Sequence, residues 1–276
     1  MSHHDKPTAR SAKQFRVHHF AQAREKGSKI TALTAYDAVT ARIFDDAGID
    51  VLLVGDSIGN VMHGHDSTLP VTVEDLIPPA RAVARAAGRA FVVVDMPFGS
   101  YESGPEQALG TAVRFMKETG VAAVKLEGGA RVAGQIRAIT QAGIPVIGHL
   151  GYTPQSIHAL GGPRVQGRDS AADELRADLA AVAEAGACAV VLEMVPAPLA
   201  GELTTASPIP TIGIGAGHGC DGQILVWTDM AGMSAWAPRF ARRFGEVGTA
   251  LREAAQDYAG AVRSGDFPGD EHSFQK

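Results

Sequence analysis

The sequence predicts an α/β fold, and within that class a (β/α)8 TIM barrel, from three observations. Short apolar runs rich in valine and isoleucine recur eight times along the chain. Continuous runs of this kind are typical of parallel strands that are covered on both faces. Segments with helical spacing lie between most of the runs, as βαβ units require. The length of 276 residues also suits one barrel of ordinary size.

The eight expected strands each end at a polar residue, a glycine or a turn. They are residues 30–37, 50–57, 90–97, 121–129, 144–151, 187–196, 209–217 and 223–230. Between Gly215 and Ile224 there is room only for a turn or a very short helix. A barrel whose seventh helix is missing fits this spacing, and so does an open sheet of seven strands.

The expected helices between the strands begin at capping residues and mostly end at glycine. They are residues 37–48, 72–88, 105–120, 130–143 and 171–186. Asp37 and Thr72 are suited to be N-caps, and Pro105 stands in a first helical turn. A leading helix is expected over 10–26 and at least one closing helix within 236–264. We expect one domain over 1–276, with a barrel core at about 28–264 and tails at 1–9 and 265–276.

Composition excludes several classes of protein. The net charge of −5 argues against a general nucleic-acid binder, which would carry a basic face. No stretch has the unbroken apolar length of a membrane span. The two cysteines, Cys188 and Cys220, form no CxxC pair, so neither a disulfide framework nor a zinc knuckle is indicated. A reducing cytoplasm is the expected compartment.

Polar and charged residues collect at the ends of five expected strands. They are Asp56, Ser57, Asp95, Lys125, Glu127, His149 and Glu193. In a barrel of this class, chemistry takes place at the carboxyl ends of the strands. These side chains would therefore converge on one mouth. A set of helix caps and surface ion pairs is the alternative, and several acidic residues at separate strand ends make it less favoured.

Neighbouring carboxylates repel one another unless a cation joins them. Oxygen ligands without thiolates favour a hard cation, and Mg²⁺ accepts one or two carboxylates while leaving room for a substrate. We therefore expect Asp56 and Asp95 to bind Mg²⁺, with Glu127 either a third ligand or a partner of the ligands. Asp37 also ends a strand, but the cap is the preferred interpretation.

The remaining rim residues have two interpretations each. Lys125 could neutralise a substrate carboxylate or pair with Glu127, which stands two positions later on the same strand face. Glu193 follows an apolar strand and could be a general base or part of a structural salt bridge. His149 could orient a substrate or be a hydrogen-bonded core histidine.

Two glycine-rich segments are further candidates for function. The stretch IGIGAGHG resembles a phosphate-binding loop on a seventh strand, although its glycines could simply make room for a bulky ligand. The segment 150–168 is long for a βα loop, and its glycines, proline and arginines suit a mobile lid. An ordered loop at a subunit contact is the alternative for this segment.

Beyond these patterns, the chain closely resembles the ketopantoate hydroxymethyltransferase family. The matching motifs are TAYD (34–37), VGDSIGN (54–60), GHDSTLPVT (64–72), DMPFGSY (95–101), VKLEGG (124–129), GHLGYTPQS (148–156), VQGR (165–168), LEMVP (192–196), IGIGAGHGCDGQILV (212–226) and FPGDEHSF (267–274). They cover almost the whole chain in the family's order, which is far more specific than any one motif.

The resemblance implies a barrel of the phosphoenolpyruvate mutase and isocitrate lyase kind. It implies a Mg²⁺-dependent transfer of a hydroxymethyl group from 5,10-methylenetetrahydrofolate to 3-methyl-2-oxobutanoate, giving 2-dehydropantoate for pantothenate synthesis. Glu193 is then the proton acceptor, and Asp56, Asp95 and Glu127 belong to the metal site. Asp56, Ser57, Asp95 and Lys125 contact the keto acid, and His149 supports them. A large cytoplasmic homo-oligomer, often a decamer, is expected.

Two other functions compete with this one. A Mg²⁺-dependent lyase or mutase of the phosphoenolpyruvate mutase type shares the barrel and the enolate chemistry, but its loop pattern KKCGH does not occur in this sequence. A non-catalytic barrel used for binding or assembly would lack several of the acidic strand ends, and all of them are present.

Overall fold

The computed structural model describes residues 13–234 and 236–274. The chain divides into two compact units, Met1–Leu225 and Val226–Lys276, and each is described by itself. The first unit contains all of the barrel. The expectation of one domain over 1–276 therefore stays a prediction.

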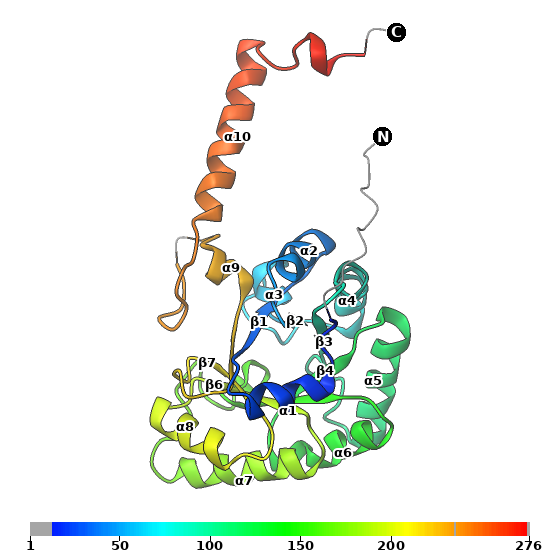
Figure 1. Cartoon of the computed structure of the whole chain (residues 1–276), viewed down its shortest axis with the longest axis vertical. Helices are drawn as coiled ribbons and strands as arrows, with labels where there is room; N and C mark the ends of the chain where they lie inside the picture. Colours follow the sequence, from blue (N-terminus) through cyan, green and yellow to red (C-terminus); the bar gives the residue numbers. More distant parts are fainter. Residues whose placement is uncertain (1–12, 235, 275–276) are drawn as a thin grey trace. The chain divides into compact units, whose positions relative to one another are not determined.

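Eight parallel strands form a closed barrel in the first unit (Figure 1), as the sequence predicts. The strands are β1 (Ile30–Thr34), β2 (Val51–Val54), β3 (Phe91–Asp95), β4 (Ala123–Glu127), β5 (Val146–Gly151), β6 (Ala189–Glu193), β7 (Thr211–Ile214) and β8 (Gly222–Leu225). Each strand pairs with the next one along the chain, and β1 pairs with β8 to close the ring. The open sheet of seven strands is therefore wrong.

The barrel interior is filled with side chains, so it is a core and not a channel. A space of only about 10 Å³ remains inside it. The interior side chains are Ala32, Val51, Leu53, Val93, Lys125, Ile147, Val191, Ile212 and Ile224. Burying each aliphatic side chain of this kind contributes about 1.5–3 kcal/mol. Apart from Lys125, these side chains are apolar, so polar chemistry is confined to the rim, where the Lys125 ammonium meets Asp95.

Helices surround the strands and cover the outer face of the barrel (Figure 1). In the first unit they are α1 (Val17–Glu25), α2 (Ala38–Asp46), α3 (Ile58–Val61), α4 (Val73–Ala86), α5 (Pro105–Thr119), α6 (Ala133–Gln141), α7 (Ala171–Glu184) and α8 (Ala197–Ala206). The described residues also form three short 3₁₀ turns: η1 (Ala130–Val132), η2 (Pro154–Ser156) and, in the second unit, η3 (Asp270–His272). No helix among the described residues is both long and apolar enough to span a bilayer.

The helix starts follow the capping chemistry that the sequence indicates. The Asp37 carboxylate accepts the backbone N–H groups of Val39 and Thr40 at 2.7 and 2.9 Å, which confirms its role as a cap. Thr72 and Asp75 form a reciprocal capping box at the start of α4. These caps fix where each helix begins, and so they fix how much chain is left for the rim loops.

Helix α1 is the predicted leading helix, and residues 10–12 of its expected range lie outside the described residues. Phe20 is buried and meets Phe91, the first residue of β3, edge to face at 5.4 Å. The Arg24 guanidinium donates to the carbonyl oxygens of Thr204 and Ile209. Because Phe91 begins β3 and Ile209 lies just before β7, these contacts hold α1 at the amino-terminal end of the barrel.

Several elements differ from the sequence-based expectation, and the short helix α3 is one of them. The last strand ends at Leu225, and the following residues form a short helix, α9 (Trp227–Ala231), in the second unit. Helix α8, between β6 and β7, was not predicted because its small, largely apolar residues show no clear face. As expected, the described chain between β7 and β8 contains only a turn. The second unit also has the closing helix α10 (Val247–Ser264), which ends at Gly265.

Candidate active site

The register of the barrel places four predicted residues at one rim. Lys125 and the interior residues Val93, Ile147 and Val191 line the lower barrel. Because strand side chains alternate in direction, residues two positions further along point to the same interior space. The residues at those positions are Asp95, Glu127, His149 and Glu193. All four stand at or next to the carboxyl end of a strand.

Asp56 and Asp95 meet at this rim although they are 39 positions apart. The backbone N–H of Asp56 donates to Asp95 Oδ2 at 3.0 Å. Both residues are nearly inaccessible, with 4% and 3% of their surface exposed. Gly55 makes this approach possible, because a Cβ at that position would lie 2.7 Å from Ser57 Oγ and 3.3 Å from Asp95 Oδ2. The structure thus brings the two predicted residues together at one rim, and their binding of a metal stays a prediction.

Lys125 pairs with Asp95 across the β3–β4 register. The two residues are register partners, and Lys125 Nζ lies 2.7 Å from Asp95 Oδ1. Burial works against the charge of Lys125, but Asp95, Glu127 and Asp56 outweigh it and raise its pKa above the usual value. Lys125 is therefore a fixed positive charge beneath the acidic rim.

A line of three side chains runs from β4 to β6. Glu127 Oε1 lies 3.4 Å from His149 Nδ1, and Glu193 Oε2 lies 3.2 Å from His149 Nε2. Burial and Lys125 would lower the pKa of His149, but Glu127 and Glu193 outweigh them and raise it to about 9. Nε2 makes no well-formed hydrogen bond to any described residue. Although Lys125 Nζ is 3.2 Å from Nδ1, the two flanking carboxylates favour the charged ring, which forms an ion pair with each of them. His149 thus holds Glu193 in place.

The pKa values of the acidic side chains are shifted in different directions by their surroundings. Burial, followed by repulsion from Asp95 and Glu127, raises the pKa of Asp56 well above its usual value. Burial also raises the pKa of Asp95, although Lys125 opposes it. For Glu127, His149 and Lys125 outweigh burial, and its pKa is lowered. A negative charge is therefore least favourable at Asp56 and Asp95, where a bound cation would stabilise it.

The donor set at Asp56 and Asp95 fits Mg²⁺. Among the described residues, no three His, Cys, Asp or Glu side chains gather into a ready metal site. Mg²⁺ commonly takes one or two carboxylates and completes its shell with water and substrate oxygens. Asp95 Oδ1 is buried and accepts no well-formed hydrogen bond, although it contacts the Lys125 ammonium. Both Glu127 oxygens face partners, His149 and the Gln155 backbone N–H, so Glu127 is arranged to support the pair.

Ser57 stands beside these carboxylates at the start of α3. Its hydroxyl lies 2.8 Å from the hydroxyl of Tyr36, which is 5% exposed. Burial raises the pKa of Tyr36, so its hydroxyl stays protonated and can hold the Ser57 side chain. Tyr36 and the residues Tyr101 and Gln155 are site residues to which sequence reasoning gave no role, although all three lie within the motifs shared with the family.

The backbone next to Glu193 is strained. Met194 has a φ of 49°, a left-handed conformation that residues with a side chain seldom adopt. Its N–H donates to the Ile214 carbonyl, and its own carbonyl accepts the Gln166 N–H, both at 2.9 Å. Strain of this kind persists only where the surroundings enforce it, and it concentrates at functional sites. It turns the chain sharply directly after Glu193.

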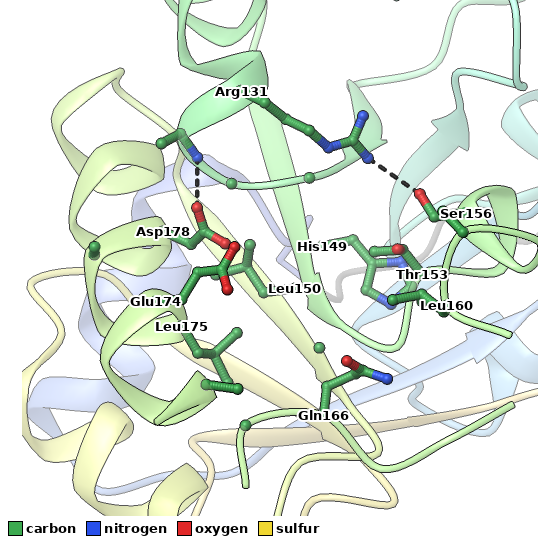
Figure 2. A pocket seen from close by; sticks show the side chains of 18 residues that line it. Arg131, His149, Leu150, Thr153, Ser156, Leu160, Gln166, Glu174, Leu175 and Asp178 are labelled. Carbon is green, nitrogen blue, oxygen red and sulfur yellow. Dashed lines mark hydrogen bonds between the residues drawn. The ribbon is translucent and has the colours of Figure 1, made fainter. Parts of the chain in front are cut away.

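A cavity of about 570 Å³ lies next to His149, between the β4 and β5 loops and helix α7. Figure 2 shows Glu174, Leu175 and Asp178 of α7 along one side and Thr153 and Leu160 along the other. Arg131 donates to the Ser156 hydroxyl at 3.3 Å near this space. Part of the wall comes from segment 150–168, whose role as a lid stays a prediction.

The glycines of IGIGAGHG make room for the chain itself. A Cβ at Gly213 would lie 3.0 Å from Cys220 Sγ, and one at Gly217 would lie 2.5 Å from the Ala197 side chain. These glycines therefore allow β7 and the following turn to pack closely against their neighbours.

Three comparisons relate this chain to known proteins. The family model described as ketopantoate hydroxymethyltransferase matches residues 14–270. The 3-methyl-2-oxobutanoate hydroxymethyltransferase of Leifsonia xyli subsp. xyli is 60% identical over 269 residues, which are 97% of each chain. The protein of the same name from Mycobacterium ulcerans is 58% identical over 271 residues, covering 97% of this chain and 91% of the relative.

Solved structures with the same fold are more distant in sequence. A phosphoenolpyruvate phosphomutase from Streptomyces platensis subsp. rosaceus matches with a TM-score of 0.62 at 16% identity, covering 91% of this chain and 88% of that one. A 2,3-dimethylmalate lyase of the phosphoenolpyruvate mutase and isocitrate lyase superfamily matches with a TM-score of 0.61 at 20% identity, covering 94% and 92%. These likenesses confirm the expected kind of barrel.

Proposed function

The chain belongs to the ketopantoate hydroxymethyltransferase family, and we propose that it transfers a hydroxymethyl group from 5,10-methylenetetrahydrofolate to 3-methyl-2-oxobutanoate, giving 2-dehydropantoate. The observation that carries this proposal is the shared position of Asp56 and Asp95 on the rim that also holds Glu193. A metal site and a base on one rim are what deprotonation next to a keto group requires. The product would feed pantothenate synthesis.

Asp56 and Asp95 would hold Mg²⁺, and Glu127 would belong to the same site as a partner of the ligands. When bound, the ion would polarise the keto acid and stabilise the negative charge that develops on its oxygens. Lys125, held by Asp95 at 2.7 Å, would attract the substrate carboxylate. The Ser57 hydroxyl, held by Tyr36, would position a substrate oxygen.

Glu193 would accept the proton from C3 of the keto acid. Its side chain is 14% exposed, more than that of any other acidic residue of the rim, so it can reach a substrate. His149 would keep the Glu193 carboxylate pointed at that proton through the 3.2 Å contact with Nε2. The carbanion left at C3 then attacks the one-carbon unit of the folate, forming the new C–C bond. The C–N bonds that hold this carbon to the folate break, water supplies the hydroxyl group, and tetrahydrofolate leaves. Orienting the reactants in this way can supply a large part of the rate enhancement.

We place the folate co-substrate in the cavity of about 570 Å³ beside His149. Ligand pockets commonly have volumes of about 300–1,000 Å³ and mostly apolar walls with a few polar groups. This cavity has leucine and alanine side chains together with Arg131, Glu174 and Asp178. A donor bound there would approach the rim from the side of β5.

We also propose that the protein works in the cytoplasm as a large homo-oligomer, with a decamer as the expected form. Helix α10 supports self-association, because its spacing places Val247, Leu251, Tyr258 and Val262 on one face. An apolar face of this kind is suited to bury against another copy.

Incubation of the protein with 3-methyl-2-oxobutanoate, 5,10-methylenetetrahydrofolate and Mg²⁺ tests the function directly. We expect 2-dehydropantoate to form in step with tetrahydrofolate and expect little of either with Glu193→Gln. Failure of the wild-type protein to consume the folate would falsify the transferase proposal. Cleavage of phosphonopyruvate or of 2,3-dimethylmalate instead would favour the alternative function, a lyase or mutase of the phosphoenolpyruvate mutase type.

A further inference from the structure

Gln155 occupies a central position among the rim residues. It lies in η2, directly after β5, and only 6% of its surface is exposed. Its side-chain Nε2 donates to Asp56 Oδ2 at 2.8 Å and to the Met96 carbonyl oxygen at 3.0 Å. The Met96 carbonyl has no proton to give, so only the NH₂ end of the amide can face it. The chemistry of its neighbours thus fixes the orientation of the amide.

The opposite end of the amide is fixed as well. The Tyr101 hydroxyl donates to Gln155 Oε1 at 2.6 Å, and Tyr101 is fully buried. The same hydroxyl lies 3.2 Å from the Glu127 carbonyl oxygen. A hydroxyl has one proton to donate, and the shorter contact, to Gln155, makes the stronger hydrogen bond. With Oε1 held, the two hydrogens of Nε2 remain directed at Asp56 and Met96.

The backbone of Gln155 reaches a second carboxylate. Its N–H donates to Glu127 Oε2 at 3.0 Å. One residue therefore touches the carboxylate of Asp56 after β2, the carbonyl of Met96 after β3, and Glu127 at the end of β4. These three contacts cross the rim from a fourth strand, β5. No other hydrogen bond to the Asp56 side chain is seen within the described part of the chain.

We propose that Gln155 is a positioning residue of this enzyme, which holds the Asp56 carboxylate where it can bind Mg²⁺. The inference rests on the proposed function, because it assigns Asp56 to the metal. Mutation of a residue that hydrogen-bonds to a metal ligand commonly lowers metal affinity or activity by about 10- to 100-fold. Without the Gln155 amide, repulsion from Asp95 and Glu127 would turn the Asp56 carboxylate away from the site.

The test compares Gln155→Met with Gln135→Met. Methionine keeps the length of glutamine and leaves the backbone N–H to Glu127 in place, so it removes only the amide contacts. Gln135 is a matched control, since it is also buried, at 8% exposure, but within the described chain its amide reaches only the Tyr101 carbonyl, at 3.4 Å. Tyr101→Phe is a second variant, which keeps the Gln155 amide but frees its oxygen.

The main readout is the dissociation constant for Mg²⁺, measured by titrating the ion into metal-free protein in a calorimeter. The unfolding temperature of each variant is measured alongside. We expect a Kd about 10- to 100-fold weaker for Gln155→Met, a smaller loss for Tyr101→Phe and an unchanged Kd for Gln135→Met. We also expect hydrogen exchange at C3 of the keto acid to recover in Gln155→Met at high Mg²⁺, which damage to the fold would not allow.

Two results would overturn the inference. The first is a folded Gln155→Met protein whose Mg²⁺ affinity is within twofold of the wild type. The second is a loss of affinity of the same size in Gln135→Met, which would assign the effect to the packing of any buried glutamine. A wild-type protein that binds no Mg²⁺ would instead overturn the metal site of the proposed function, and this inference with it.

Discussion

The backbone N–H of Asp56 donates to the Asp95 carboxylate at 3.0 Å, which joins the ends of β2 and β3 at one point of the barrel rim. The contact brings two acidic residues together in a buried space, where water cannot solvate the charge of either carboxylate. Lys125 compensates only part of this negative charge, through its ion pair with Asp95. The arrangement is therefore prepared for a divalent cation, and several expectations follow from it.

Asparagine at position 56 or 95 should abolish Mg²⁺ binding. Each substitution keeps the shape of the side chain and removes the negative charge that attracts the ion, and a ligand carboxylate is worth more than an ordinary hydrogen bond. Calorimetry on the metal-free variants measures the loss. Asp37→Asn is the matched control, because Asp37 also follows a strand but caps α2. Retention of wild-type affinity in Asp56→Asn would remove that residue from the metal site.

His149 should be positively charged at neutral pH in the metal-free protein. Its pKa is raised to about 9 because Glu127 and Glu193 outweigh burial and Lys125. A histidine with a raised pKa gives its full stabilisation below its ordinary pKa of about 6.5. That stabilisation is lost as the pH rises through about 9. The stability advantage of the wild type over His149→Gln should therefore shrink between pH 6.5 and 10, as measured by urea unfolding.

Nitrogen-15 NMR of the imidazole checks the same prediction at the residue itself. The signals assigned by comparison with His149→Gln should show a protonated ring at pH 7.5. In Glu127→Gln the ring should lose its proton at a lower pH, because one of its two carboxylate partners is gone. A neutral His149 ring at pH 7.5 in the metal-free wild type would contradict the assignment of charge.

Filling the cavity beside His149 should separate the two halves of the reaction. Ala159 lines this space, so Ala159→Trp should obstruct the folate and lower hydroxymethyl transfer by at least about tenfold. Exchange of the C3 hydrogen should continue, because it needs no folate. Ala180→Trp, on an exposed position of α7 outside the cavity, is the control. Equal rates of transfer in Ala159→Trp and the wild type would place the folate elsewhere.

The fold itself should depend strongly on Asp45. Its carboxylate accepts the backbone N–H groups of Gly88, Arg89 and Ala90 at 2.6–2.9 Å, and thereby ties the end of α2 to the chain entering β3. Because these donors would lose a charged acceptor, Asp45→Ala should lower the free energy of unfolding by about 3 kcal/mol. Asp173→Ala, whose side chain is 86% exposed, should change it by less than about 0.5 kcal/mol. Similar urea midpoints for the two variants would refute this.

Much of the rim could be predicted from the sequence because local rules decide it. Strand alternation directs Asp95, Glu127, His149 and Glu193 into the interior, and parallel pairing gathers the strand ends at one rim. The caps at Asp37 and Thr72 are likewise local. These features depend only on the order of residues and the period of a strand, so they can be predicted without knowledge of the tertiary contacts.

The rest depends on contacts that the sequence does not display. Gln155 reaches Asp56 across 99 positions and Tyr101 across 54, and no periodicity marks either contact. The last strand was expected to run to Met230 because its apolar residues continue past Leu225. In the structure the chain leaves the sheet there and forms α9, so an apolar run alone did not fix the end of the strand.

Exchange of the C3 hydrogen of 3-methyl-2-oxobutanoate for deuterium tests the central claim most directly. The claim is that Asp56 and Asp95 hold a cation on the same rim as the base Glu193. We predict exchange in the wild type that requires Mg²⁺ but no folate, and that falls sharply in Glu193→Gln. Exchange that proceeds equally without Mg²⁺, or at the full rate in Glu193→Gln, would contradict it.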